Sequence, residues 1–209
     1  MSARKIAFVA LLAASSLTIT ACESGSSVQP PATTSENQGI QSGTAQTSHA
    51  PTTAEKYTPA TAKGPAKNVP VPQMPESASK NSENGARNFS EYYFDLVNYT
   101  IETNDTKLIK KFTTHACEVC GLSIIDPADR AKIDGRWQVG GKHRYEVLAS
   151  EITGENLAVT SVRYSADSAK FYVEPHVVES ELERLPSTIV ALGLEYDSGW
   201  KVYKIVGDD

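Results

Sequence analysis

Two cysteines three positions apart, in Cys117-Glu118-Val119-Cys120, are the residues of this chain that most directly suggest chemistry. A thioredoxin-type oxidoreductase needs such a pair at the start of a helix, after a strand and within a βαβ unit. Here the sequence predicts a short basic helix before the pair and no βαβ pattern after it. In an exported protein, two nearby cysteines normally form a disulfide, and this spacing in a helical turn allows the required Cα separation. We therefore predict a structural disulfide between Cys117 and Cys120, with a redox-active pair as the alternative.

A metal site is the third interpretation of the same segment. His115 would join the two cysteines, giving the run His-Ala-Cys-Glu-Val-Cys. Zinc usually takes four protein ligands in a structural site, and no suitably spaced fourth ligand follows. We therefore predict neither a metal nor a cofactor.

The N-terminus has the features of an export signal. Arg4 and Lys5 precede an uncharged stretch, Ile6–Ile19, that is too short to span a bilayer as a helix. The following residues, Ile19-Thr20-Ala21-Cys22, resemble a bacterial lipobox. That resemblance implies cleavage between Ala21 and Cys22 and attachment of acyl chains such as palmitate to Cys22, on the extracytoplasmic face of the cell membrane. The alternative is an ordinary signal peptide that leaves Cys22 as a free thiol.

The composition changes sharply after this signal. In residues 23–75, Ser, Thr, Pro, Gly, Ala and Gln supply 38 of 53 positions, which predicts a disordered linker, with or without attached sugars. Residues 76–209 carry 15 Lys and Arg against 22 Asp and Glu, and this net charge of −7 argues against nucleic acid as a partner. We expect three parts: a signal peptide over 1–21, a lipidated linker over 22–75 and a globular domain over 76–209.

Hydrophobic periodicity in the domain predicts helices first and antiparallel strands afterwards. The expected helices are Ser77–Thr103 and Lys107–Phe112, the latter with Asp105 as N-cap. Gly121–Ile133 is expected to be a shorter helix or a pair of turns, interrupted near Pro127. The expected strands are Arg136–Val139, His143–Ser150, Leu157–Ser165, Lys170–Glu174, Thr188–Tyr196 and Trp200–Val206, and Pro175–Pro186 is expected to be a loop. Gly140-Gly141 and Asp197-Ser198-Gly199 are expected to be hairpin turns. The fold class is therefore α+β, with N-terminal helices packed on one curved antiparallel sheet.

Four segments give this pattern a resemblance to the cystatin-like cone of the nuclear transport factor two-like superfamily. They are Phe89–Tyr93, Asn98-Tyr99, the helix break Asn104-Asp105-Thr106, and Asp197–Val202. The whole chain is similar to an uncharacterised family of actinobacterial lipoproteins. This resemblance implies the fold and a surface location, and it implies no activity.

The cone fold often encloses a cavity, and some relatives place an acid or a histidine inside it as a general base. The side chains that could reach such a cavity are Asp95, Tyr92, Tyr99, His143 and His176. A general base needs a reachable proton and a suitable pKa, and neither is visible in a sequence. We therefore assign no catalytic residue.

Three hypotheses for the function follow. The favoured one is a non-enzymatic, lipid-anchored module that binds a protein, the cell wall or a small apolar partner. The second is a cone-fold enzyme or small-molecule carrier with an interior cavity. The third is a thiol-disulfide oxidoreductase at Cys117 and Cys120.

Overall fold

A computed structural model of the chain describes residues 55–207, and the predicted signal peptide, Ala21 and Cys22 lie outside the described residues. The helices are η1 (Glu76–Ser79), α1 (Glu83–Thr103), α2 (Lys107–Lys111), α3 (Glu118–Cys120), the π-helical turn η2 (Gly121–Ile125) and α4 (Asp126–Ile133). The strands are β1 (Trp137–Gly140), β2 (His143–Gly154), β3 (Leu157–Ala166), β4 (Ala169–Glu174), β5 (Val177–Leu182), β6 (Leu185–Tyr196) and β7 (Trp200–Gly207). The predicted α+β class is confirmed.

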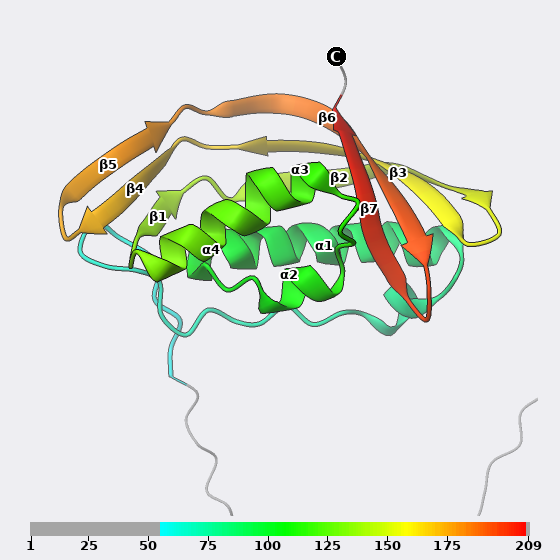
Figure 1. The fold of residues 1–209 in the computed structure, drawn as a ribbon, viewed down its shortest axis with the longest axis horizontal. Coiled ribbons are helices and arrows are strands. Elements are labelled where there is room, and N and C mark those ends of the chain that lie inside the picture. Colours follow the sequence, from blue (N-terminus) through cyan, green and yellow to red (C-terminus); the bar gives the residue numbers. More distant parts are fainter. Residues whose placement is uncertain (1–54, 208–209) are drawn as a thin grey trace, which may run out of the picture. The chain divides into compact units, whose positions relative to one another are not determined.

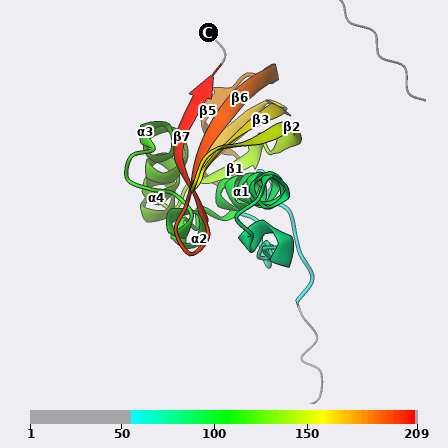
Figure 2. The same cartoon turned by 90° about the vertical axis from the view of Figure 1, so that its right-hand side faces the viewer.

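The strands form two antiparallel sheets, and not the single sheet that the sequence predicts. One has the order β1-β4-β5 and the other β2-β3-β6-β7. Two residues separate β1 from β2, β3 from β4, and β5 from β6. We call each of these consecutive strand pairs a ribbon, and each ribbon passes from one sheet to the other (Figure 1). The breaks lie at Gly141-Lys142, Asp167-Ser168 and Glu183-Arg184. The helices lie under the arch that these ribbons make (Figures 1 and 2).

The break between the sheets at Gly141-Lys142 corrects the hairpin predicted at Gly140-Gly141. Gly140 and Gly141 have φ angles of +83° and +76°, as the expected hairpin would need, but β1 pairs with β4 and β2 pairs with β3. The segment Ala166–Ala169 likewise joins two sheets, because β3 and β4 pair with other strands. The expected hairpin between β6 and β7 at Asp197–Gly199 is confirmed. A strand at Val177–Leu182 replaces most of the expected loop, and it was missed because it lies at a sheet edge with every residue exposed.

Helix α1 organises the core. The Ser82 hydroxyl caps it by accepting a hydrogen bond from the Gly85 N–H at 3.1 Å, and the helix ends where Asn104 adopts a left-handed conformation. The helix lies against β2 and β3, and its buried side chains share one hydrophobic core with those of β6 and β7. The large, almost fully enclosed side chains of this core are Phe89, Tyr93, Leu96, Leu192, Leu194, Trp200 and Val202. The predicted helix over Ser77–Thr103 is in fact two elements, because Lys80 and Asn81 separate η1 from the Ser82 cap.

The later helices also begin differently from the prediction. The N-cap of α2 is Thr106, and the Asp105 carboxylate accepts a hydrogen bond from the Lys107 N–H at 3.1 Å. The segment Gly121–Ile133, predicted as a helix or a pair of turns interrupted near Pro127, consists of η2 and α4. Pro127 lies in the first turn of α4, where a proline fits.

Residues 55–75, within the segment that the sequence assigns to the linker, lie against the domain. Thr58 pairs with Lys67 in an isolated β-bridge, and the Trp137 indole donates a hydrogen bond to the Thr61 carbonyl at 2.8 Å. The His176 N–H donates to the Ala62 carbonyl at 2.7 Å. Within residues 55–207, no helix combines the length and the hydropathy needed to cross a membrane.

Candidate functional site

A pocket with a volume of about 530 Å³ lies between the helices and the point where the ribbons break. Helix α1 forms one side of it, η2 and α4 form the second, and residues at the sheet junction form the third. Its apolar lining residues are Val97, Ile101, Ile124, Pro127, Ala128, Ala131, Ala166, Ala169, Phe171, Leu182 and Leu185. Its charged residues, Asp167, Glu183 and Arg184, are exposed, so the pocket opens to solvent there.

A second pocket of about 270 Å³ adjoins the first. Five residues line both pockets: Val97, Ser123, Ile124, His143 and Leu185. The remaining lining residues of the smaller pocket are aromatic or aliphatic: Tyr93, Phe94, Val119, Tyr164, Val190 and Ile205. We call the two together the groove, with a larger and a smaller compartment that meet at His143.

Two features of the chain leave room for the groove. The ribbons change sheets at Asp167-Ser168 and Glu183-Arg184, so the concave side of the domain is not filled by one continuous set of strand side chains. On the helical side, the π-helical turn η2 presents Ser123 and Ile124, and α4 presents the small side chains of Ala128 and Ala131. Such turns are frequent at functional sites, because they widen the helix locally.

Helix α4 is held beside the groove by polar contacts to the other helices. The Asp129 carboxylate accepts hydrogen bonds from the Thr106 hydroxyl and the Lys110 ammonium, both at 2.6 Å. These two donors lower the pKa of Asp129, which stays ionised at neutral pH. At the end of the segment, the Asn104 amide donates to the Arg136 carbonyl at 2.8 Å.

His143 is the titratable side chain at the junction of the two compartments. The Asn98 side chain fixes its backbone from both sides: Oδ1 accepts from the His143 N–H at 2.7 Å, and Nδ2 donates to the His143 carbonyl at 2.9 Å. The imidazole ring lies 5.0 Å from the Tyr164 ring and 6.2 Å from the Phe94 ring, centre to centre. Its Nδ1 atom is buried and has no hydrogen-bond partner within residues 55–207.

Burial lowers the pKa of His143, since the charged imidazolium loses its hydration there. The ring is therefore neutral at physiological pH, with one nitrogen as donor and the other as acceptor. Such a side chain can bind a polar ligand atom without carrying a charge into an apolar site.

Cys117 and Cys120 form a disulfide, as the sequence predicts, with their Cα atoms 5.2 Å apart. Both residues belong to the hydrophobic core, and Cys120 is completely buried. The bridge closes the turn that leads from α3 into η2, so it braces one wall of the groove. Nearby His115 is exposed, and the described part of the chain contains no cluster of three or more potential metal ligands.

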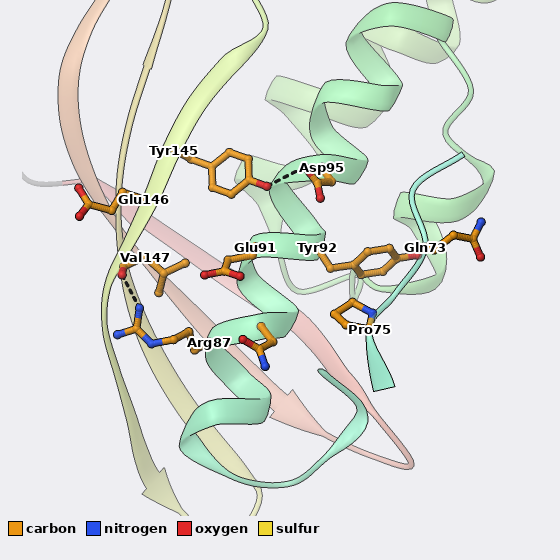
Figure 3. A pocket seen from close by; sticks show the side chains of 10 residues that line it. Gln73, Pro75, Arg87, Glu91, Tyr92, Asp95, Tyr145, Glu146 and Val147 are labelled. Carbon is orange, nitrogen blue, oxygen red and sulfur yellow. Dashed lines mark hydrogen bonds between the residues drawn. The ribbon is translucent and has the colours of Figure 1, made fainter. Parts of the chain in front are cut away.

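Two of the predicted cavity residues, Asp95 and Tyr92, lie together at a different place, an open polar cleft of about 720 Å³ on the other side of α1 (Figure 3). The Tyr145 phenol donates a hydrogen bond to the Asp95 carboxylate at 2.6 Å (Figure 3). Burial, and then the negative charge of Asp95, raise the pKa of Tyr145, so the phenol stays protonated. Asp95 is exposed. The Tyr145 phenol and the Asp95 carboxylate therefore satisfy each other by hydrogen bonding. Asp95 is not shielded from water as a buried general base would be.

The remaining predicted cavity residues lie apart from both pockets. Tyr99 is half-buried on α1 and lines neither the groove nor the cleft. His176 is exposed in the turn between β4 and β5 with φ at +66°. The structure thus places His143 in a largely apolar groove and does not place the other four with it.

Sequence reasoning missed most of the groove. Ser123, Ile124, Ala128 and Ala131 come from a segment predicted as a short helix or a pair of turns, with no π-helical turn expected. Leu182 and Leu185 come from a predicted loop. The small residues at positions 128 and 131, three apart on one helix face, were the signal available in the sequence.

Comparison with known proteins identifies a family for this chain and finds solved structures that align with it. The model of DUF6318, a family of unknown function, matches residues 55–203. No curated protein matches the chain. Among the solved structures that match is the crystal structure of the intermembrane space region of chloroplast protein ARC6, with a TM-score of 0.47 and 11% identity. The alignment covers 61% of this chain and 97% of that one.

Proposed function

The chain belongs to DUF6318, a family of unknown function, and we propose that it is a cell-envelope lipoprotein whose folded domain binds a small, mainly apolar molecule in the groove. In this proposal a lipid on Cys22 holds the domain at the extracytoplasmic face of the membrane. The domain acts as a non-enzymatic binding module with the cone fold of the nuclear transport factor two-like superfamily, in a lipoprotein of the actinobacterial type.

The groove is the observation that carries this proposal. Its larger compartment, at about 530 Å³, lies within the range of ligand pockets, roughly 300–1,000 Å³. Apolar side chains line most of both compartments, and two polar side chains, Ser123 and His143, lie where they meet. An apolar cavity with a few placed polar groups is the usual form of a small-molecule site.

Binding is better supported than catalysis because, within residues 55–207, no acid-base or nucleophilic set with mutual hydrogen bonds lines the groove. His143 has no carboxylate partner among the described residues, and its ring touches aromatic side chains instead. The Tyr145–Asp95 pair lies in the open cleft, away from the groove. The sulfur pair is buried in the core, which favours a structural disulfide over an exchanging one.

Substitution at Ser123 tests the groove. Ser123 is exposed and lines both compartments, so Ser123→Trp places a large ring at their junction with little disturbance of the core. Its control is Leu122→Trp, one residue earlier, at a side chain that is 70% exposed and lines neither compartment. We expect the neutral fluorescent probe N-phenyl-1-naphthylamine to bind the unsubstituted domain and the Leu122→Trp variant. We expect Ser123→Trp to lose at least tenfold in affinity.

Equal binding by both tryptophan variants would contradict the assignment, since the probe would then bind elsewhere. Absence of binding to the unsubstituted domain would contradict it as well. In these measurements all proteins carry Cys22→Ser in the full chain, so that no detergent is needed to keep a lipid anchor in solution.

The anchor has its own test. Cys22→Ser removes the atom that would be acylated, and we expect the protein to move from the membrane fraction to the soluble extracytoplasmic fraction. Ser26→Ala is the matched control, since it changes a nearby hydroxyl and leaves the cysteine in place. Retention of the Cys22→Ser protein in the membrane fraction would show that the lipobox interpretation is wrong.

A further inference from the structure

We infer that the ligand of the groove is an uncharged amphiphile, with one long apolar chain and a hydroxyl-type group that hydrogen-bonds to the imidazole of His143. This inference rests on the proposed function, because it names the chemical class that the same site would bind. It follows from three properties of the groove: an unused polar side chain, balanced charges at the opening, and an extended apolar wall.

The unused polar side chain is His143. Its Nδ1 is buried, and neither ring nitrogen forms a hydrogen bond with the residues of the described chain. Nε2 is not among the buried unpartnered atoms, and His143 lines both compartments, so we assign Nε2 as the nitrogen that meets a molecule in the groove. The ring cannot easily turn towards another partner, because Asn98 holds the backbone and Phe94 and Tyr164 flank the imidazole. A ligand group is therefore the available partner.

A hydroxyl suits this position better than a charged group. It can donate or accept, so it matches a neutral imidazole in either tautomer. A carboxylate or an ammonium would bring a charge into an apolar site, and a charge without a paired counter-charge is costly to bury. Burial already keeps the pKa of His143 low, so the ring offers an anion no positive charge.

The charged residues at the opening of the groove do not favour a ligand head group of either charge. Asp167 accepts two hydrogen bonds from the Arg144 guanidinium, at 2.6 Å and 2.9 Å. The other two charged lining residues, Glu183 and Arg184, are opposite in sign and adjacent in sequence. An anionic or a cationic head group would thus meet no uncompensated cluster of opposite charge.

The apolar wall sets the shape of the ligand. The lining residues of α1 and its C-cap run from Tyr93 in the smaller compartment to Asn104 in the larger one. At the rise of an α-helix, this stretch is about 16 Å long, which is enough for an extended chain of roughly ten carbons. The smaller compartment, with Phe94, Tyr164 and Val190, presents rings and aliphatic groups to such a chain.

The test compares three ligands with the same ten-carbon chain: 1-decanol, decanoate and decyltrimethylammonium. Their affinities are measured by displacement of N-phenyl-1-naphthylamine from the full chain carrying Cys22→Ser, with and without His143→Phe. Phenylalanine keeps a ring among the aromatic neighbours and removes both nitrogens. We expect 1-decanol to bind most tightly, and His143→Phe to weaken it about tenfold, as the loss of one buried hydrogen bond implies. The two charged ligands should bind weakly to both proteins.

Tightest binding by decanoate or by decyltrimethylammonium would overturn the inference, and so would an unchanged affinity of His143→Phe for 1-decanol. A merely structural role for His143 would weaken the binding of all three ligands and of the probe alike. If His143→Phe does not fold, His143→Gln, which restores a donor and an acceptor, should retain most of the preference for 1-decanol. A probe that binds and is blocked by Ser123→Trp, but shows no preference for the alcohol, would overturn this inference and leave the proposed function standing.

Discussion

Reduction of the disulfide gives the sharpest prediction about how this domain is held together. Cys117 and Cys120 are three residues apart, so the bridge closes a loop of only about four residues. In the chain-entropy model, such a loop restricts the unfolded chain by about 2 kcal/mol at 25 °C. Since the unfolded ensemble carries most of this effect, we expect the reduced protein to keep the same fold with lower stability.

The assay is urea denaturation of the oxidised protein and of protein reduced while unfolded and then refolded in reductant. With a slope of about 2 kcal/mol per molar urea for a domain of this size, the midpoint should fall by about 1 M at constant slope. Cys117→Ala with Cys120→Ala should fall at least as far, because both side chains are buried in the core.

An unchanged or higher midpoint after reduction would refute this reasoning. A catalytic pair predicts a different outcome, namely reduction of insulin by the reduced protein and loss of that activity in the double variant. We expect no such activity from either protein.

Two further predictions concern pH and backbone. Burial lowers the pKa of His143 below its usual 6.5, so on acidification the unfolded chain binds a proton before the folded protein does. The free energy of unfolding should therefore fall as the pH drops below about 6.5. Thermal melts between pH 7.5 and 5 should show this loss, and His143→Phe should abolish it. Asp129, whose pKa is lowered from 3.8, reduces stability only in a more acidic range. Equal pH dependence of the unsubstituted protein and of His143→Phe would therefore contradict the assignment to His143. Gly85→Ala should cost several kcal/mol, since its Cβ would lie 1.9 Å from the Lys80 carbonyl oxygen, whereas Gly121→Ala, with nothing within 4 Å, should change stability by about 1 kcal/mol or less. Urea midpoints of the two glycine variants measure this difference, and similar midpoints would contradict it.

The helical half of the fold could be predicted in large part from the sequence because its signals are local. The apolar stripe of α1 and the break at Asn104 act within one or two turns, whereas the Ser82 cap, which is equally local, was not predicted. The final hairpin at Asp197–Gly199 was equally accessible, since its turn residues are adjacent.

The sheet arrangement could not be predicted in the same way. A glycine pair with positive φ angles suits a hairpin and also suits a sharp break between two sheets, and only the pairing with β4 and β3 distinguishes these outcomes. Strand β5 lacked the alternation of a half-buried strand, because all six of its residues are exposed.

The candidate site was the least predictable part. His143 stood among five residues without a way to rank them, because the groove is assembled from α1, η2, α4 and the sheet junction, which are distant in sequence. The His143 ring has no hydrogen-bond partner among residues 55–207 because its neighbours are aromatic side chains such as Phe94 and Tyr164. Only the fold brings these residues together.

The most direct test of the groove as a binding site is an amide chemical-shift titration of the labelled full chain, carrying Cys22→Ser, with 1-decanol. The account predicts the largest shifts at Val97, Ser123, Ile124, His143 and Leu185, which line both compartments. Shifts gathered around Asp95 and Tyr145 in the polar cleft, or no saturable shifts at all, would contradict it.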